Sequence, residues 1–388
     1  MSGPLTGVLV ADFTRLLAGP HATMMLADLG ADVVKVEAPG GDDARSWGPP
    51  FVTDGSSVYF QSANRNKRSV ILDLKTPHGR AAAHALGARA GILLHNFRPG
   101  VAESFGLGHP ELSAVNPGLV YCAISGFGSA AGPEAVGNDF LLQAVGGLLS
   151  ITGPADGPGV KVGFPVVDIL TGCYAAIGVL AAWSHRMRTG EGQLVEVDLM
   201  SALLASLANQ GANHLNAGLV PRALGTEHPS IAPYASFATA DCDIAIAVAS
   251  DRQFAGLARA LGRAELSADP RFARNADRVT HRDSLRAELE SALTTRPATD
   301  WLPVLREGGV PAGITHTVPE AFAFAREFGL SPEVWLPGTD GASVGSVATP
   351  FRLTGTPIAH RHAAPRPGEH TDEVLRELGI ATDRGDTP

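Results

Sequence analysis

The sequence predicts an α/β fold in which a Rossmann-like parallel-sheet large domain is joined to a smaller α+β domain. Short apolar runs of strand type alternate with helix-like segments through residues 8–198, and polar or glycine-rich turns follow the strands. The chain has 388 residues, of which 45% are hydrophobic, so it is long enough to bury two cores.

The chain opens with a predicted β-α-β unit, made of a strand at 8–13, a helix at 21–29 and a strand at 31–37. The loop at 15–20 lies where such units bind phosphate-bearing ligands. It lacks the G-x-G-x-x-G pattern that lets a pyrophosphate approach the backbone, so an NAD site is disfavoured even though Glu37 stands where a ribose-binding acid would.

A basic cluster follows, with Arg65, Lys67 and Arg68 leading into a predicted strand at 70–75. Such clusters are commonly solvated loops. Because this one lies at a strand end in an acidic protein, we interpret it as a phosphate site. Further predicted elements are a helix at 77–90, strands at 91–95, 119–124 and 193–198, and helices at 169–185 and 200–209.

Asp168 is the only charged residue between Lys161 and His185, and apolar residues surround it in the sequence. We expect it at the start of a helix beginning near Ile169, where free backbone N–H groups and the helix dipole would hold it ionised. Such an aspartate is commonly an N-cap and nothing more. An ionised, poorly hydrated carboxylate is also a competent nucleophile.

The surroundings of Asp168 favour the nucleophile. The segment reads N-D-x-x-x-Q-A-x-x-G-L-x-S-x-T-G, then D-G-P, K-V-G-x-P and V-D-x-x-T-G-x-Y-A-A-x-G-x-L-A-A. Earlier in the chain stand A-G-P, G-A-x-V-x-K-V-E, N-x-N-K-R-S-x-x-L-D-L-K, N-F-x-P-G and S-G-F-G, in that order. With these motifs the chain resembles the family III CoA-transferases, in which the aspartate at the position of Asp168 is the acyl-accepting nucleophile.

The resemblance also implies where coenzyme A binds. The diphosphate and 3′-phosphate of CoA suit arginine and lysine, and its adenine suits an apolar slot. Two positions depart from the family pattern, because Ala38 and Ser104 stand where relatives often have basic residues. The implied CoA-binding residues are Arg15, Leu72, Asp73, Leu74, Lys75, Asn96, Phe97, Arg98, Ser125, Gly126 and Phe127.

The implied activity is transfer of CoA from an acyl-CoA thioester to a free carboxylic acid through an aspartyl anhydride and an aspartyl-CoA thioester. Acyl-CoA is then a substrate, and no permanently bound cofactor is expected. Backbone N–H groups near Gly146 and Gly147, or at Gly225, could stabilise the oxyanions. The segment 225–234 resembles that of relatives acting on dicarboxylic acids such as succinate. His228 or Arg222 could meet a second carboxylate, or the segment could merely rigidify an interdomain link.

Two alternatives stay open. The α-methylacyl-CoA racemases use the same fold, but they carry a histidine where this chain has Asn138, which cannot exchange a proton near neutral pH. A non-catalytic acyl-CoA-binding protein is the alternative of another class.

The second half of the sequence predicts a boundary between two domains. We place the large CoA-binding domain at 1–220, the small α+β domain at 221–330, and a returning segment at 331–388 that completes the large domain. His360, His362 and His370 lie in this last segment without matching acids or cysteines, so no metal site is expected. The resemblance implies an interlocked homodimer.

Charge and cysteine content limit the binding partners and the cellular compartment that we expect. A net charge of −9 argues against nucleic-acid binding. The three cysteines are far apart and outside metal or redox spacings, so we expect core or near-core thiols in a reducing compartment. No signal peptide is visible and the longest apolar stretch, 172–183, is too short for a membrane span. A cytoplasmic protein that acts away from membranes is expected.

Overall fold

The computed structural model describes residues 3–132, 134–338 and 341–381. The chain divides into two compact units. The first comprises Met1–Leu148, Val162–Leu219 and Ser331–Pro388, and the second comprises Leu149–Lys161 and Val220–Leu330. The segment 149–161, which the sequence analysis assigns to the large domain, is thus grouped with the second unit.

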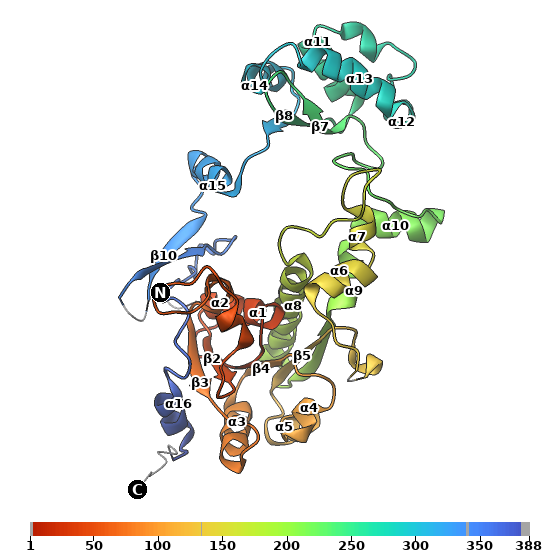
Figure 1. The fold of residues 1–388 in the computed structure, drawn as a ribbon. Coiled ribbons are helices and arrows are strands. Elements are labelled where there is room, and N and C mark those ends of the chain that lie inside the picture. The colour runs from red at the N-terminus through yellow and green to blue at the C-terminus, as the bar shows by residue number, and fades with distance from the viewer. Residues whose placement is uncertain (1–2, 133, 339–340, 382–388) are drawn as a thin grey trace. The chain divides into compact units, whose positions relative to one another are not determined.

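The first unit is built on a six-stranded sheet in the order β3-β2-β1-β4-β5-β6, and each neighbouring pair is parallel (Figure 1). The order reverses between β1 and β4. Because parallel strands end at the same edge, the loops after these two strands form the topological switch point where such sheets bind ligands. The strands are β1 (Leu9–Phe13), β2 (Asp32–Glu37), β3 (Lys67–Ile71), β4 (Ile92–His95), β5 (Val120–Ser125) and β6 (Gln193–Asp198).

Helices cover both faces of this sheet, which explains why its strands are apolar on both sides. Val10 and Val33 belong to a core shared with α1 (Ala18–Asp28), α8 (Val166–Thr189) and α9 (Leu199–Ser206). The adjacent residues of the same strands face the other core, which is shared with α3 (Pro77–Arg89), α5 (His109–Val115) and α16 (Thr371–Leu378). The unit also holds α2 (Val58–Asn64), α4 (Val101–Ser104), α6 (Asp139–Val145), α10 (Ala208–Ala217) and the 3₁₀ turns Asp43–Ser46 and Ser129–Ala131, while α7 (Leu148–Ile151) spans the boundary between the units.

The C-terminal segment returns to the first unit. Strands β10 (Glu333–Pro337) and β11 (Ser343–Val347) form a hairpin. Arg65 contacts this hairpin, and its Nη1 donates to the Val347 carbonyl at 2.8 Å. Farther along, the His370 N–H donates to the Ser69 carbonyl at 2.9 Å. These contacts join the last part of the chain to the edge strand β3, and α16 packs against α3.

The second unit has its own core around the antiparallel sheet β7 (Tyr234–Ala238), β8 (Asp243–Ala247) and β9 (Ala312–Ile314). Phe237 and Ile244 from the sheet pack with Phe254 and Leu289 from the helices. The unit therefore buries enough apolar surface to form a separate core. Its helices are α11 (Asp251–Ala260), α12 (Asn275–Thr280), α13 (Arg282–Leu293), α14 (Ala298–Glu307) and α15 (Val318–Glu327), with a 3₁₀ turn at Ala264–Ser267.

Two element boundaries differ from the sequence predictions in ways that affect the site. Strand β3 begins at Lys67, so Lys67 and Arg68 are part of the sheet, and of the basic cluster only Arg65 precedes it. Helix α8 begins at Val166, so Asp168 lies inside its first turn. The short strand β9 and the β10–β11 hairpin are absent from the sequence prediction because their residues show little alternation of apolar and polar side chains.

Helix α8 is also longer than its apolar stretch suggested. Its 24 residues are long and apolar enough to cross a membrane by length and composition alone. Core helices of globular domains pass the same test, and α8 contributes Val167, Ala175 and Val179 to the first core.

The prediction of core or near-core thiols is wrong for one cysteine. Cys122 is buried and Cys173 is partly buried, but Cys242 is exposed in the turn between β7 and β8. The two aspartates flanking Cys242 make this a polar turn that does not join the core.

Candidate active site

Asp168 lies in the first turn of α8 and is partly buried. The sequence predicts that Asp168 accepts the free N–H groups at the start of its helix, but a different acid accepts them. The Oδ1 atom of Asp139, from the first turn of α6, accepts the backbone N–H groups of Val167 at 2.8 Å and of Asp168 at 3.3 Å. The helix N-terminus is therefore capped by Asp139, and the prediction that free N–H groups hold Asp168 ionised is wrong.

The protonation of Asp168 follows from this arrangement. Burial, together with the negative charge of Asp139, raises the pKa of Asp168 to about 7. No hydrogen bond to its carboxylate occurs within the described part of the chain. Near neutral pH this acid is a mixture of carboxyl and carboxylate, and its carboxylate form is a much stronger base than an ordinary aspartate.

Tyr59 on α2 belongs to the same cluster. Burial, with the charges of Asp168 and Asp139, raises the pKa of its phenol to about 12. Its ring packs edge-to-face on that of Trp47, with centroids 5.1 Å apart. Neither aromatic residue could be singled out from the sequence, because no charge or spacing marks them and only the fold brings α2 to the start of α8.

The start of α8 lies against the start of α1. A side chain at Gly172, one turn beyond Asp168, would place its Cβ 2.7 Å from the carbonyl oxygen of Ala18. Only glycine allows this approach. Because Ala18 is the first residue of α1, the loop after β1 and the nucleophile candidate Asp168 belong to the same end of the first unit.

The two loops at the switch point are tied together. The Arg15 N–H donates to Asn96 Oδ1 at 2.9 Å, and Asn96 Nδ2 donates back to the Arg15 carbonyl at 2.8 Å. The Arg15 side chain is exposed, with an ion pair to Asp43 at 3.7 Å across the surface. Two residues predicted to bind CoA therefore meet at the edge where a phosphate-bearing ligand is expected.

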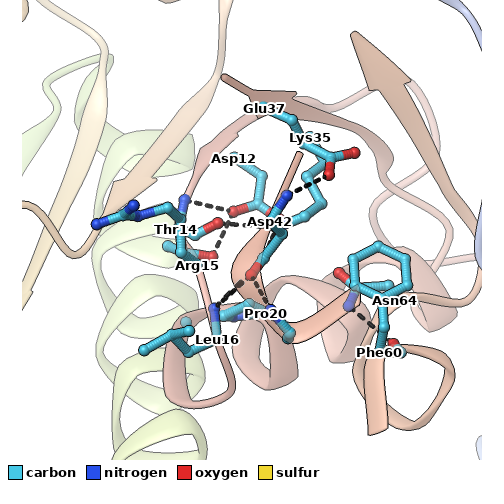
Figure 2. A network of polar contacts seen from close by, with 12 residues as sticks. Asp12, Thr14, Arg15, Leu16, Pro20, Lys35, Glu37, Asp42, Phe60 and Asn64 are labelled. Atoms are coloured by element: carbon cyan, nitrogen blue, oxygen red, sulfur yellow. Dashed lines mark hydrogen bonds and ion pairs between the residues drawn. The ribbon is translucent and has the colours of Figure 1, made fainter. Parts of the chain in front are cut away.

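A buried ionic network supports this loop (Figure 2). Lys35 Nζ pairs with Asp42 Oδ2 at 2.8 Å and donates to the Thr14 carbonyl at 2.8 Å. Asp42 accepts the N–H of Leu16, whose φ of 69° lies in the left-handed region. A leucine rarely adopts this conformation, so the network stabilises a turn that the local sequence would not favour.

The basic cluster serves this network and the sheet, so the phosphate-site interpretation is wrong. Lys67 is fully buried and lies 3.1 Å from Asp12. Arg65 pairs with Asp28 at 2.6 Å, and Arg68 pairs with three carboxylates, the nearest of them at 2.6 Å. Fixed carboxylates already neutralise all three cations, so none of them is available to a phosphate.

The remaining predicted CoA residues differ in exposure. Lys75 and Arg98 are exposed, at loops after β3 and β4, and no ion pair to either occurs among the described residues. Leu72 is buried, Leu74 and Phe97 pack partly against the second core, and the Phe97 ring stacks on His95 at 5.4 Å. Asp73 accepts the Lys75 N–H at 3.0 Å, which shapes that loop.

The turn after β5 is a close backbone contact. A Cβ on Gly126 would lie 2.7 Å from the Cα of Gly137. Ser125 Oγ accepts the Gly128 N–H at 3.0 Å, and Phe127 packs against the first core. The turn is therefore fixed close to the chain that leads into α6 and Asp139.

The predicted oxyanion donors are already used. The N–H of Gly146 donates to the Leu142 carbonyl at 2.8 Å and that of Gly225 to the Gly153 carbonyl at 2.9 Å. Gly147 donates to Ala144 at 3.5 Å. The sequence showed flexible glycines but could not show that backbone carbonyls occupy their N–H groups.

The connector at 220–233 is held within the second unit. Glu227 pairs with Arg286 at 2.5 Å, and His228 Nδ1 accepts the Ser230 N–H at 3.1 Å. These contacts support a rigidifying role for the segment. Arg222 is exposed, and it has no ion pair to any residue in the described ranges.

Comparison with known proteins decides the class. The family model for CoA-transferase family III matches residues 5–371. This chain belongs to CoA-transferase family III. The assignment confirms the family expected from the motifs, and with it the CoA-transferase activity.

Relatives of this CoA-transferase cover nearly its whole length. It is 41% identical over 383 residues to the succinate–glutarate CoA-transferase of Agrobacterium fabrum, covering 97% of this chain and 96% of that one. It is 38% identical over 391 residues to the succinyl-CoA:mesaconate CoA-transferase of Haloarcula hispanica, covering 98% of each. A CAIB/BAIF family protein from Brucella suis has a similar structure, with a TM-score of 0.85 and 39% identity over 97% of this chain and 100% of that one.

Proposed function

We propose that this CoA-transferase moves CoA between succinyl-CoA and another dicarboxylic acid, with Asp168 as the nucleophile. The observation that carries the proposal is a partly buried carboxyl at the start of α8, with its pKa raised to about 7 and its helix N–H groups taken by Asp139. The printed activities of relatives that act on succinate, glutarate and mesaconate support the substrate class.

The reaction would proceed by two acyl exchanges at Asp168. The carboxylate attacks the thioester carbonyl, the C–S bond breaks, and CoA leaves as thiolate from a mixed anhydride. The thiolate then attacks the Asp168 carbonyl, which forms an aspartyl-CoA thioester and releases the first acid as carboxylate. The incoming carboxylate repeats these steps in reverse, so no external oxidant or proton donor is required. A basic carboxylate in a poorly hydrated place suits the first attack.

Exposed cations in the loops that follow three strands of the parallel sheet would bind the phosphates of CoA. Arg15, Lys75 and Arg98 follow β1, β3 and β4 and carry no strong internal ion pair. Phe97 offers an apolar surface for the adenine. Ala38 and Ser104 remove cations that relatives often have, so these three residues would carry most of the attraction for phosphate.

Arg222 is the cation of the connector that can still bind a carboxylate, since it is exposed and has no ion pair among the described residues. This guanidinium is exposed on the connector, whereas the contacts of Glu227 and His228 fix the rest of the segment. A bidentate arginine–carboxylate pair would select dicarboxylic over monocarboxylic acids.

An interlocked homodimer is part of the proposal. Several large apolar side chains of the first unit face solvent in the single chain, among them Phe140 on α6, Ile177 on α8 and Leu215 on α10, which are 56%, 62% and 82% exposed. An exposed apolar surface of this kind is typical of a subunit interface. Light scattering coupled to gel filtration would measure the mass, and a monomer at micromolar concentration would contradict this part.

The test is transfer from succinyl-CoA to a panel of mono- and dicarboxylic acids, followed by chromatography of the CoA esters. We expect the highest rates with C4 and C5 dicarboxylates, and we expect Asp168→Ala to lose transfer while it still binds CoA. Exchange of the acyl α-proton in deuterated water without transfer would instead indicate a racemase. That outcome is disfavoured because Asn138 caps α6, its Oδ1 accepting the Leu141 N–H at 3.0 Å.

A further inference from the structure

Two carboxylates meet at the start of α8, and they are treated differently. Asp139 takes the N–H groups of Val167 and Asp168, the donors that a helix N-terminus would otherwise offer to a nearby anion. The carboxylate of Asp168 receives no hydrogen bond from any residue that the structure describes. The acid that we propose as the nucleophile is therefore not the acid whose charge the N-terminus of α8 stabilises.

Asp139 is held rigidly in this position. Its second oxygen accepts Gln143 Nε2 at 2.6 Å, and Gln143 is fully buried. Gln143 Oε1 in turn accepts the Val162 N–H at 2.9 Å, from the segment that leads into α8. Asp139 also lies in the first turn of α6, where the helix dipole favours its charge.

We propose that Asp139 is a positioning residue for the transfer reaction: it occupies the N-terminus of α8 and places a fixed negative charge beside Asp168, which keeps the nucleophile a strong base. The inference rests on the proposed role of Asp168. Nucleophilicity rises with basicity, so the arrangement increases the rate of attack at the cost of partial protonation near neutral pH.

The groups around Asp168 agree with this role. Asp139 from α6 is the charged group that acts on it. Burial and the charges of both carboxylates raise the pKa of Tyr59 from α2 to about 12, so its phenol is neutral near neutral pH. His21 from α1 lies against Gly172, and burial with the nearby cations Lys67 and Arg65 lowers its pKa to about 4, so it is neutral at the working pH. Among the residues that the structure describes, no cation forms an ion pair with Asp139.

The test is the pH profile of kcat/KM for Asp139→Asn and Asp139→Glu. We expect Asp139→Asn to move the acidic midpoint down by about one pH unit or more and to lower the plateau rate about tenfold, because the nucleophile becomes a weaker base. Asp139→Glu keeps the charge and should keep the midpoint near 7. Asp198→Asn is the matched control, since Asp198 caps α9 through the Ser201 N–H at 2.7 Å, and its midpoint should not move.

A midpoint that stays in place in Asp139→Asn while the rate falls would show a merely structural role and overturn the proposal. If that variant does not fold, the ¹³C carboxyl titration of the unaltered protein decides, because the proposal requires the ionisations of Asp168 and Asp139 to be coupled. A two-step titration of Asp168 that also follows the ionisation of Asp139 supports the proposal, and independent titrations of the two acids contradict it. Loss of the proposed function is recognised separately, as the lack of any adduct on Asp168 in the unaltered enzyme.

Discussion

Two buried or partly buried aspartates of the first unit have pKa values that shift in opposite directions. Asp12, at the end of β1, is fully buried, yet its pKa is lowered. Burial alone would raise that pKa, but Lys67 and Lys35 and the hydroxyls of Thr14 and Thr23 outweigh it. Asp168 is less buried, but its pKa rises to about 7 because burial raises it and the negative charge of Asp139 raises it further.

The difference teaches that partners, more than depth, decide what a buried acid does. Asp12 is surrounded by donors, which makes it a structural anion that fixes the loop carrying Arg15. No hydrogen bond to the Asp168 carboxylate occurs among the described residues, and its raised pKa fits the role of nucleophile that we propose for it. The loop that Asp12 fixes packs close to the start of α8, where Asp168 lies.

The largest expected effect separates the two acids by activity. Asp168→Ala should lower kcat for CoA transfer by about 10³-fold or more, because it removes the carboxylate that we propose forms the covalent adduct. Calorimetric binding of CoA should change little. A variant with more than a few per cent of the activity would contradict the role of Asp168.

The next-largest expected effect concerns the contribution of Asp12 and its cation to the free energy of unfolding. Lys67→Met leaves Asp12 buried without its nearest cation, so we expect a loss of about 3–5 kcal/mol in the free energy of unfolding, measured with urea. The double variant with Asp12→Asn should recover part of the loss. If the single variant is as stable as the unaltered protein, the network does not support the loop.

Removing the carboxylate of Asp168 should raise the free energy of unfolding, whereas Lys67→Met should lower it. The folded-state pKa of Asp168 lies above its ordinary value of 3.8, so its contribution to stability is present below about pH 4 and is lost as the pH rises through about 7. Asp168→Asn escapes this loss. Allowing for partial solvent screening, the variant should be about 1–2 kcal/mol more stable at pH 8 and equal at pH 4. Greater stability of the unaltered protein at pH 8 would contradict the raised pKa.

The smallest effect compares an exposed arginine that has one long ion pair, Arg15, with an arginine that has three short ones, Arg68. Arg15→Ala should raise the KM for acyl-CoA about fivefold with kcat little changed, because it removes an exposed phosphate contact. Arg68→Ala is the control, since its guanidinium already pairs with Asp32, Glu373 and Glu377. Equal KM changes in both variants would return the basic cluster to consideration as a phosphate site.

Much of the first unit could be predicted from the sequence. The strand–helix alternation and the family motifs predicted the sheet, and residue 168 was marked by its isolation among apolar residues. The prediction failed where distant segments decide the chemistry. The start of α8 is capped by Asp139, from 29 positions earlier in the chain, and Lys67 is neutralised by Asp12, 55 positions earlier. Spacing in the sequence does not reveal such partners, so a buried lysine and a phosphate-binding one could not be told apart.

The most direct test of the central claim is the covalent state of Asp168 during turnover. The enzyme is incubated with succinyl-CoA, quenched with hydroxylamine, digested, and analysed by mass spectrometry. The account predicts an aspartyl hydroxamate at Asp168 that requires succinyl-CoA and is absent from Asp168→Ala. Transfer that continues without any hydroxamate at Asp168, or a hydroxamate at another acid, would contradict it.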